Sequence, residues 1–587
     1  MEQWLVTNKK ADFKGIGQKF NIDPVTARIM TNRGLKTDED ISLFLYGSIF
    51  DLPDAHLMKD ADKLVSILCD KISQHKKIRI IGDYDIDGVM SSYILWRALS
   101  RVGADVDIAI PDRITDGYGL NRNLIEDADI SGVEVILTCD NGIAAIDEIK
   151  YARDLGMTVL VTDHHAIPFE EADGQRVEKK SCADAIVNPH QEECRYPYKE
   201  LCGAGVAWVV VTLLYKQLGV TMEEAYALLE FAAFATVGDV MPLTGANRII
   251  VKAGLERIHQ TENVGMNALI TACGLTPDII DSYHFGFILG PCVNAAGRLE
   301  TAVEALRLFQ CKDEGKASEM AENLVALNEE RKELTKQGVE EAVAVFEKEH
   351  YENDPVLVIY LPDVHESIAG IIAGRIRERY YRPTFILTKN SDGGVKGSGR
   401  SIDEYSMYEE MCKCSGLLSR FGGHPMAAGL SLPEENVDEF RKQMNANCLL
   451  RVEDMVEKVH IDVPMPVGYV TEHLIEEFSV LKPFGTANPK PVFADRNLQV
   501  CGIRVMGKNR NVTKFTLKNE YGQTITAVKF GDADEVLDYI KEKYGEEALN
   551  NAMTGRENPV VLSMVYSPQI NEFRGAKSIE FNIQYYR

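Results

Sequence analysis

Between residues 77 and 187, short runs of apolar residues alternate with longer stretches of helical periodicity. The runs cover residues 78–81, 106–110, 133–138, 157–161 and 185–187, and two helical stretches between them span about 89–102 and 144–155. A continuous apolar run is typical of a strand buried on both faces, as in a parallel sheet covered by helices. This part of the chain is therefore predicted to form a doubly wound α/β domain that ends near residue 265.

The remaining segments predict further domains of different kinds. A helical stretch from about 316 to 350 has no proline and carries an apolar stripe, which predicts a long helix between two lobes. A second α/β segment starts at residue 355, and short alternating strands at 514–517 and 524–530 predict a small C-terminal β-barrel. The predicted order is a helical lead-in (1–50), the first α/β domain (51–265), a connecting helical region (266–350), the second α/β domain (351–452) and the β-barrel (453–587).

The composition narrows the choice of partners and compartment. The formal net charge of −25 argues against a protein that coats itself in nucleic acid, but it leaves room for a local basic channel. The twelve cysteines include no Cys-x-x-Cys pair, so free thiols are expected rather than a structural zinc. The start of the chain lacks the features of a signal peptide, and the most apolar stretch (204–215) is too short to cross a bilayer. We therefore expect a cytoplasmic protein with no membrane association.

Acidic residues and histidines follow three of the apolar runs directly, and one more aspartate ends a helical stretch. These residues are Asp83, Asp85 and Asp87 after 78–81, Asp140 after 133–138, Asp163, His164 and His165 after 157–161, and Asp239. In an open α/β sheet, ligands bind in the crevice outside the carboxyl ends of the strands. Carboxylate oxygens and imidazole nitrogens there could hold two divalent ions, which clamp the attacking and leaving oxygens of a phosphoester. The pattern predicts a metal-dependent phosphoesterase.

Each of these motifs also has a plainer explanation. Residues 83–88 look like part of a calcium loop, but Ile94 stands where that loop requires glutamate. The other three motifs could be a turn, a histidine pair bonded to backbone and a helix terminus. These explanations do not account for all four elements meeting at one expected sheet edge, so the metal site is the stronger interpretation.

The ordered set of motifs resembles a known superfamily. Gly-Asp-Tyr-Asp-Ile-Asp-Gly (82–88), Asp-Asn-Gly (140–142), Asp-His-His (163–165) and Gly-Asp (238–239) closely resemble the motifs of the DHH phosphoesterases. The resemblance implies that His165 lies near the scissile phosphate and that the metal ligands are Asp85, Asp87, Asp140, His164 and Asp239. Asp83 is left open as a further ligand, because Ile81 stands where many relatives place a histidine.

Motifs outside the first domain resemble one branch of that superfamily. Residues 397–401 and 421–429 look like its DHHA1-type substrate-binding domain, and residues 291–298 and 483–489 look specific to the RecJ branch. The resemblance implies a 5′-to-3′ single-strand-specific DNA exonuclease that releases mononucleotides by two-metal-ion hydrolysis with Mn²⁺ or Mg²⁺ and acts in DNA repair and recombination. It also implies an OB-like C-terminal domain, a monomer, and three partners: single-stranded DNA, a RecQ-type helicase and a single-strand-binding protein.

Substrate contacts are expected mainly in the second lobe. The candidates are Arg298, Arg375, Ser398, Arg400, Gly422, Gly423 and His424. Arginine offers a planar fork of donors to phosphate, and paired glycines let the backbone approach a ligand closely. The alternatives are a helix cap for Arg298, a solvated basic helix face for Arg375 and a structural role for His424.

The C-terminal domain carries a weaker signal for single-strand binding. Lys508, Arg510, Lys514 and Phe515 interleave basic and aromatic residues, as in grooves where bases stack. A basic strand whose phenylalanine belongs to the core explains the same residues. The resemblance, rather than this spacing, favours the OB-like fold.

Two other functions fit parts of the sequence. A small-molecule phosphoesterase of the same superfamily would act on pyrophosphate, cyclic dinucleotides or short oligonucleotides, but it needs no third, β-rich lobe. A scaffold that has lost its metals would keep the fold, yet the aspartate and histidine set is complete apart from residue 81. A nuclease that acts on a long single strand is therefore the leading hypothesis.

Overall fold

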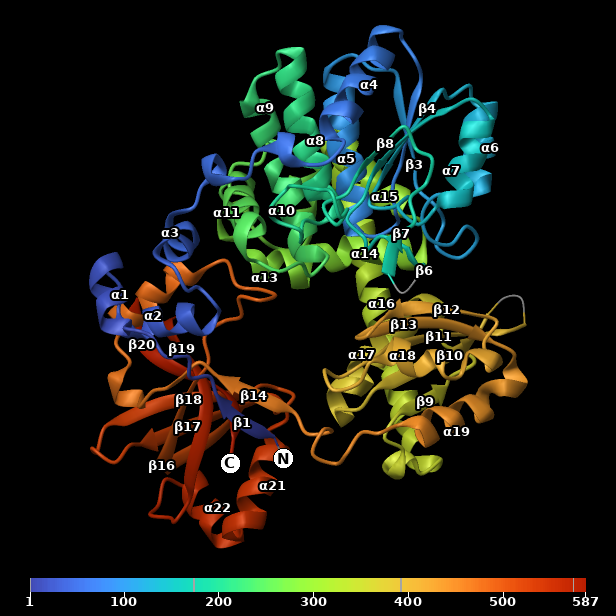
Figure 1. Cartoon of the computed structure of the whole chain (residues 1–587). Coiled ribbons are helices and arrows are strands. Elements are labelled where there is room, and N and C mark those ends of the chain that lie inside the picture. The colour runs from blue at the N-terminus through green and yellow to red at the C-terminus, as the bar shows by residue number, and fades with distance from the viewer. Residues whose placement is uncertain (1, 173–174, 391–392, 574) are drawn as a thin grey trace. The chain divides into compact units, whose positions relative to one another are not determined.

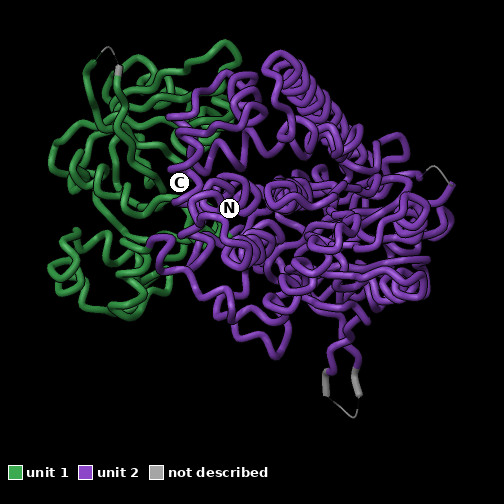
Figure 2. The backbone as a smooth tube through the Cα atoms, turned by 90° about the horizontal axis from the view of Figure 1, so that it is seen from above, with its two compact units in different colours: residues 1–47, 458–587 green, residues 48–457 purple. Residues whose placement is uncertain are grey.

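The computed structural model describes residues 2–172, 175–390, 393–573 and 575–587. The chain forms two compact units, one of residues 48–457 and one that combines residues 1–47 with 458–587 (Figure 2). Each unit has its own hydrophobic core. Within the described ranges, no helix is long and apolar enough to span a membrane.

A five-stranded parallel sheet organises the first lobe of the larger unit (Figure 1). Its order is β3 (Val106–Ala109), β2 (Ile78–Ile81), β4 (Val135–Cys139), β5 (Thr158–Thr162) and β8 (Ala185–Val187), and every neighbouring pair is parallel. Successive residues of a strand face opposite cores, as Ile136 and Leu137 do. The prediction of a doubly wound parallel sheet is confirmed.

Helices cover both faces of this sheet. One face carries α4 (Ala61–Ser73), α5 (Ile86–Arg101) and α8 (Gly203–Leu218), with α10 (Leu229–Gly238) packed on α5 and α8, and the other face carries α6 (Arg122–Ile130) and α7 (Ile146–Asp154). From β2 the strand order runs to β3 on one side and to β4 on the other. The loops after β2 and β4 therefore flank a switch point, which is where ligands bind in such sheets.

Further elements extend this lobe and lead to the second one. They are the unpredicted hairpin β6 (Phe169–Ala172) and β7 (Gln175–Glu178), α9 (Met222–Tyr226), α11 (Gly245–Ile258), α12 (Val264–Ala272), α13 (Ser282–His284), the π-helical turn η4 (Phe285–Leu289), α14 (Gly290–Leu299), α15 (Ala302–Gln310) and α16 (Glu314–Lys348). The helix α16 has 35 residues and lies close to the predicted bounds. Its Leu324 packs in the first lobe and its Phe346 in the second, so α16 connects the two lobes.

The second lobe is a five-stranded mixed sheet. Its order is β12 (Arg420–His424), β13 (Ala427–Leu432), β11 (Val395–Arg400), β10 (Thr384–Lys389) and β9 (Leu357–Tyr360); β9 and β10 are parallel and the other pairs antiparallel. One face packs on α16 and α17 (Ala369–Tyr380), and the other on α18 (Met407–Cys412) and α19 (Val437–Asn447). The first predicted substrate motif thus lies in the central strand β11, and the second spans the edge strand β12 and the start of its neighbour β13.

The smaller unit contains a closed β-barrel. Its strands pair in the order β16 (Phe493–Met506), β17 (Val512–Lys518), β18 (Thr524–Phe530), β20 (Ala576–Tyr586) and β19 (Val561–Phe573), and β19 also pairs with β16. The prediction of a C-terminal β-barrel is confirmed. Phe515 is fully buried in its core, so the interpretation of Phe515 as a base-stacking residue is wrong. Its neighbour in that motif, Arg510, forms an ion pair with Asp534.

The N-terminal segment belongs to the same unit as the barrel. It contains α1 (Phe13–Phe20), α2 (Pro24–Asn32), α3 (Asp38–Tyr46) and β1 (Gln3–Val6), which pairs in parallel with β14 (Lys458–Ile461). Side chains of α2 and α3 share a core with the barrel strands. The sequence predicts only helices here, because a strand whose partner lies at the other end of the chain leaves no local signal. The expected boundaries at 50, 265, 350 and 452 stay predictions.

Candidate metal centre and substrate cavity

The loop between β2 and α5, with the first turn of α5, supplies three carboxylates. Asp85 is the N-cap of α5, and its Oδ1 accepts hydrogen bonds from the backbone N–H groups of Asp87 (3.0 Å) and Gly88 (3.1 Å). A Cβ atom at Gly88 would lie 2.4 Å from the carbonyl oxygen of Asp83, so this tight turn requires glycine. The carboxylate of Asp87 is buried and accepts hydrogen bonds of 2.5 and 2.8 Å from two backbone N–H groups at the start of α8.

The other candidate ligands come from three separate elements. Asp140 follows β4 in the left-handed conformation (φ 60°), His164 follows β5, and Asp239 ends α10. The side-chain amide of Asn141 donates a hydrogen bond of 3.0 Å to the carbonyl oxygen of Ile81. This bond ties the loop after β4 to the end of β2, so the two sides of the switch point are held together.

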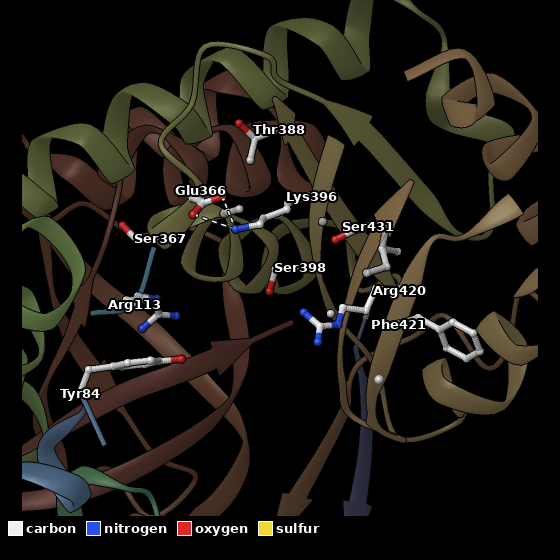
Figure 3. A pocket seen from close by; sticks show the side chains of 15 residues that line it. Tyr84, Arg113, Glu366, Ser367, Thr388, Lys396, Ser398, Arg420, Phe421 and Ser431 are labelled. Carbon is white, nitrogen blue, oxygen red and sulfur yellow. Dashed lines mark hydrogen bonds and ion pairs between the residues drawn. The ribbon is translucent and has the colours of Figure 1, made fainter. Parts of the chain in front are cut away.

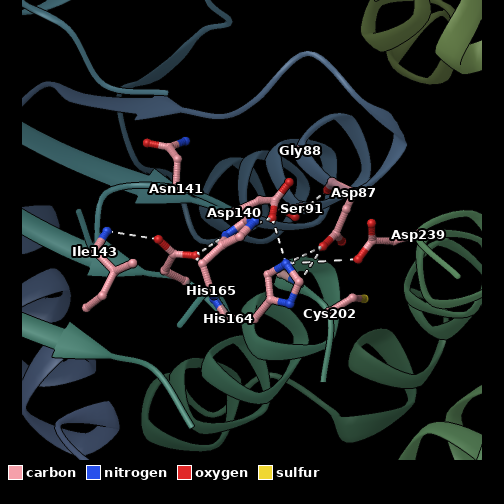
Figure 4. A network of polar contacts seen from close by, with 12 residues as sticks. Asp87, Gly88, Ser91, Asp140, Asn141, Ile143, His164, His165, Cys202 and Asp239 are labelled. Atoms are coloured by element: carbon pink, nitrogen blue, oxygen red, sulfur yellow. Dashed lines mark hydrogen bonds and ion pairs between the residues drawn. The ribbon is translucent and has the colours of Figure 1, made fainter. Parts of the chain in front are cut away.

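His164 lies where these elements converge (Figure 4). Its Nε2 atom is 3.1 Å from Oδ1 of Asp140, 3.5 Å from Oδ2 of Asp87 and 4.0 Å from Oδ2 of Asp239. Three groups have ligand atoms that all lie within 4.8 Å of one another: Asp83 with Asp85 and Asp140, Asp87 with His164 and Asp239, and Asp140 with His164 and His165. Asp140 and His164 each belong to two of these groups, so neighbouring groups share a ligand and together could hold two ions.

The donor set fits divalent cations. Oδ1 of Asp83 and Oδ1 of Asp140 are buried and accept no hydrogen bond among the described residues, and such orphaned oxygens are costly without a cation. Burial, followed by the charges of neighbouring carboxylates, raises the pKa of Asp83, of Asp140 and of Asp239, the last to about 9. Bound Mn²⁺ or Mg²⁺ would offset both effects, since hard oxygen ligands and imidazole suit these ions.

Asp163 positions the histidines rather than offering a free ligand. Its Oδ2 accepts a hydrogen bond from the backbone N–H of Ile143 (2.8 Å), and its Oδ1 accepts those of His164 (2.7 Å) and His165 (3.0 Å). Oδ1 also lies 2.7 Å from Nδ1 of His165. Burial alone would lower the pKa of His165. The hydrogen bond to Asp163 and the negative charge of Asp163 raise it by more, so that the pKa is about 9 overall. His165 is therefore held in place as a cation in the metal-free protein.

Without divalent ions, the free energy of unfolding should fall as the pH rises from about 4 to about 9, the range set by Asp239. The folded state binds more protons than the unfolded state over this window, because a carboxyl with a raised pKa stays protonated only when buried. His165 acts in the same direction, since its stabilising charge is lost as the pH passes its raised pKa. Thermal unfolding in EDTA at a series of pH values in this range measures the slope of the free energy of unfolding against pH.

Two comparisons decide whether that slope comes from the metal centre. Saturating Mn²⁺ should flatten it, because the ions stabilise the ionised carboxylates. Asp239→Asn should also flatten it in EDTA, whereas Asp129→Asn, at an exposed position on α6, should not. A metal-free protein that becomes more stable as the pH rises would contradict the expectation.

A cavity of about 460 Å³ opens next to the metal loop (Figure 3). Tyr84 and Arg113 line it from the first lobe. From the second lobe it is lined by residues 366, 367 and 369, at and just before the start of α17, and by residues of β10, β11, β12 and β13. The guanidinium of Arg113 lies 4.7 Å from the centre of the Tyr84 ring. Lys396 and Arg420 add positive charge, although Lys396 pairs with Glu366 at 3.0 Å. The cavity is therefore suited to an anion.

Two half-buried arginines adjoin this cavity. Arg298, in the last turn of α14, donates a hydrogen bond of 2.7 Å to the carbonyl oxygen of Ser367. Arg400 donates to Oγ of Ser398 (3.2 Å) and to a backbone carbonyl oxygen (2.7 Å). Burial, with the charges of neighbouring arginines, lowers the pKa of Arg400 and that of Arg298, the latter to about 10. In the described part of the chain neither forms an ion pair with a carboxylate, so both can serve a phosphate.

Comparisons with known proteins agree with this architecture. Family models match at residues 77–236 (DHH family, N-terminal domain), 353–448 (DHHA1 domain) and 461–585 (RecJ OB domain). The single-stranded-DNA-specific exonuclease RecJ of Haemophilus influenzae is 30% identical over 597 residues, which cover 97% of this chain and 97% of that protein. This chain belongs to the RecJ family.

Other RecJ proteins show the same likeness. The single-stranded-DNA-specific exonuclease RecJ of Bacillus subtilis is 35% identical over 525 residues, which cover 89% of this chain but 65% of that longer protein. The crystal structure of RecJ in complex with Mn²⁺ from Thermus thermophilus matches with a TM-score of 0.81 and 26% identity, covering 100% of this chain and 79% of that one. The resemblance found in the sequence motifs is thus confirmed, and so is the three-part RecJ fold.

The predicted site residues of this RecJ chain are not all gathered in one place. The six predicted metal ligands and His165 lie together. Ser398 and Gly422 line the cavity, and Arg298 and Arg400 adjoin it.

Gly423 has a φ of 146°, and a Cβ there would lie 2.4 Å from the carbonyl oxygen of Ala427, so it is needed for pairing β12 with β13. His424 is exposed at the end of β12, and Arg375 lies in a different groove.

Several residues of this RecJ site are not predicted from the sequence. Tyr84, Arg113, Lys396 and Arg420 line the cavity, and Asn294 accepts a hydrogen bond of 2.8 Å from the backbone N–H of Ile86 in the metal loop. Arg113 follows β3 closely, so the strand-end rule that found the aspartates could have found it too. The other residues left no comparable signal, because they depend on contacts between distant segments.

Proposed function

We propose that this chain is a metal-dependent exonuclease that hydrolyses single-stranded DNA from its 5′ end and releases mononucleotides in DNA repair and recombination. Membership of the RecJ family supports this activity, since the relatives named above are single-stranded-DNA-specific exonucleases. The observation that carries the proposal is a cluster of carboxylates and histidines beside a cation-lined cavity within one compact unit. The cluster suits the scissile phosphodiester, and the cavity suits a terminal phosphate.

The residues of the metal centre divide into ligands and positioning groups. Two Mn²⁺ or Mg²⁺ ions, held by Asp83, Asp85, Asp87, Asp140, His164 and Asp239, would activate water and neutralise charge at the scissile phosphate. Asp163 fixes the orientation of His165, whose side chain is 41% exposed at the crevice. We assign to His165 a contact with an oxygen of the scissile phosphate, to which its imidazole N–H could donate a hydrogen bond.

The cavity explains why the enzyme would work from a strand end. Arg298, Arg400 and Ser398 would bind the 5′-terminal phosphate, and the exposed backbone of Gly422 and Gly423 lets a nucleotide approach β12 closely. Ala369, the first residue of α17, also lines the cavity, where a helix N-terminus favours an anion. His424 and Arg375 are assigned to nucleotides outside this cavity.

Further properties follow from a single-strand substrate. A RecQ-type helicase would supply separated strands, and a single-strand-binding protein would present them, so we include both as partners. The barrel, matched by the RecJ OB domain, would contribute further contacts to the strand. We propose that the protein acts in the cytoplasm as a monomer, because each unit has its own core and the metal centre and cavity both lie within one unit.

Digestion of end-labelled nucleic acids tests the function directly. Single-stranded DNA with Mn²⁺ or Mg²⁺ should yield labelled mononucleotide from the 5′ end from the first time points, and duplex DNA should be resistant. Single- and double-stranded RNA, and each divalent metal in turn, complete the comparison. Cleavage of dinucleotides with no degradation of long strands would instead favour a phosphodiesterase for short oligonucleotides, cyclic dinucleotides or pyrophosphate.

A further inference from the structure

Two cysteines meet where helices α12 and α14 pack beside the connecting helix α16. Cys273 is the C-cap of α12, Cys292 lies in α14, and their Sγ atoms are 3.9 Å apart. Among the described residues, no other pair of the twelve cysteines shares a hydrogen-bond contact. The two sulfurs need to approach by only about 2 Å to reach the length of a disulfide bond. This pair is therefore the candidate for a reversible disulfide.

The two thiols differ in their surroundings. Cys273 is half-buried, whereas only 2% of the surface of Cys292 is exposed. The hydrogen bond with Cys292 lowers the pKa of Cys273, and the charge of Lys332 acts in the same direction, so that the two outweigh burial. The same contact, together with burial, raises the pKa of Cys292. Because the thiolate is the reactive form, an oxidant would react first with Cys273, and Cys292 would then resolve the product.

Helix α14 connects this cysteine pair to the metal centre and to the cavity. Its Asn294 accepts the hydrogen bond of 2.8 Å from the backbone N–H of Ile86 in the metal loop. A Cβ atom at Gly297 would overlap the carbonyl oxygen of Tyr84, so α14 packs directly against the same loop. Arg298, in the last turn of the helix, lies beside the cavity. A small displacement of α14 would therefore change both the metal loop and the phosphate site.

Oxidation of Cys292 would remove contacts that now hold the start of α14. Its Sγ donates a hydrogen bond of 3.3 Å to the carbonyl oxygen of Ile288, in the π-helical turn η4, and accepts one of 3.5 Å from the side-chain amide of Asn328 on α16. A disulfide sulfur has no proton to donate, so the bond to Ile288 would be lost. The approach to Cys273 would also change the distance to Asn328. Such π-helical turns are rare and occur mostly at functional sites.

We propose that Cys273 and Cys292 form a reversible disulfide when the protein meets hydrogen peroxide, and that this disulfide lowers hydrolysis at the metal centre by displacing α14. The effect on hydrolysis rests on the proposed exonuclease function, whereas formation of the disulfide does not. In a reducing cytoplasm the bond would be transient, because cellular thiols reduce it again by exchange. The pair is therefore a redox-sensitive modification site.

The oxidation consumes one hydrogen peroxide molecule per disulfide. The thiolate sulfur of Cys273 attacks one peroxide oxygen, the O–O bond breaks, and the departing hydroxide takes up the proton of the thiol to give water. The sulfur is thereby oxidised by two electrons to a sulfenic acid, and the peroxide is reduced. Sγ of Cys292 then attacks that sulfur, the S–S bond forms, the S–O bond breaks, and the hydroxyl leaves as water with the proton of Cys292.

Treatment of the full chain with hydrogen peroxide, without metal and followed by removal of the peroxide, tests the proposal. The oxidised protein should lose two of its twelve free thiols, and mass spectrometry should find one pair of peptides joined through Cys273 and Cys292. Its kcat/KM on single-stranded DNA with Mn²⁺ should fall at least about 10-fold, because small misplacements of positioned groups are costly. Reduction by a phosphine should restore both the thiols and the rate.

Single substitutions assign the two roles. Cys292→Ser should stop the oxidation at a sulfenic acid on Cys273, which dimedone would label, whereas Cys273→Ser should leave Cys292 unlabelled because that thiol is buried. Both variants should keep the rate of the reduced wild-type protein after peroxide treatment. The matched control is Cys311→Ser, since Cys311 is also half-buried and the C-cap of a helix, α15, but its Sγ contacts a backbone carbonyl oxygen. This control should be inactivated like the wild-type protein.

Three results would count against the disulfide as a switch. Loss of activity that Cys273→Ser does not prevent would overturn the proposal, and so would a fully formed disulfide that leaves kcat/KM unchanged. Twelve free thiols after peroxide treatment would overturn it as well. If the reduced wild-type protein cleaves no DNA, the failure lies with the proposed function, and the thiol count and joined peptides still decide whether the disulfide forms.

Discussion

Replacement of Asp140 by alanine should lower DNA hydrolysis by more than about 1,000-fold, which exceeds the usual loss for one preorganised electrostatic group. Asp140 belongs to two of the three clusters of potential ligand atoms, and its Oδ1 has no hydrogen-bond donor among the described residues. Removing it should disturb both ion positions rather than one. The release of mononucleotides from 5′-labelled single-stranded DNA with Mn²⁺ measures the loss.

Metal binding gives this prediction a second measurement that does not depend on turnover. Mn²⁺ at 100 times its Kd should raise the free energy of unfolding of the wild-type protein by about 2.7 kcal/mol. The Asp140→Ala protein should lose most of this gain, while Asp129→Ala, at an exposed position on α6, should keep it along with full activity. An Asp140→Ala protein that still hydrolyses DNA at the wild-type rate would remove Asp140 from the metal centre.

Replacement of Arg400 by alanine should remove the preference for a 5′-phosphorylated strand. Arg400 is half-buried beside the cavity and, among the described residues, bonds only to neutral oxygens, so its charge is free for a phosphate. A charged hydrogen bond of this kind contributes roughly 1.5–3 kcal/mol, so kcat/KM on 5′-phosphorylated DNA should fall about 10- to 150-fold. On 5′-hydroxyl DNA the change should be small. Initial rates on the two matched oligonucleotides measure the difference.

Two further variants show whether the fork geometry of Arg400 matters. Arg400→Lys keeps the charge but loses the paired donors, so it should restore only part of the preference. Arg451→Ala removes an exposed arginine of the same unit and should behave as wild type. An equal loss on both substrates would mean that Arg400 supports the fold of β11 rather than the terminal phosphate.

The metal centre was the part of the site that the sequence predicted most completely. Each ligand motif follows a continuous apolar run or ends an apolar helix, and parallel strands bring their carboxyl ends to one edge. Asp85, Asp140 and His164 could therefore be placed together without knowledge of any contact. The ligand role of each residue remains a prediction. The structure shows that each belongs to a group whose ligand atoms all lie within 4.8 Å of one another.

The phosphate cavity could be predicted only in part from the sequence. Ser398 and Arg400 lie in a glycine-rich motif that could be recognised locally, whereas Arg113 and Tyr84 reach the cavity from a different lobe. The helix α16 packs in the cores of both lobes, and this packing decides which of the many arginines face that cavity. The same packing places Arg375 in a different groove, away from the residues with which it was grouped.

Local patterns in the sequence determined the parallel sheet, the long connecting helix, the β-barrel and the strand-end carboxylates. Periodicity and strand-end motifs are short-range signals, and the physical rules that interpret them need no distant partner. Only the tertiary structure decided that the carboxylate of Asp163 accepts hydrogen bonds from three backbone N–H groups and so orients His165. It also decided that Phe515 is buried in the barrel core and that β1 pairs with β14. Each of these depends on hydrogen bonds or packing between segments distant in sequence, which periodicity cannot encode.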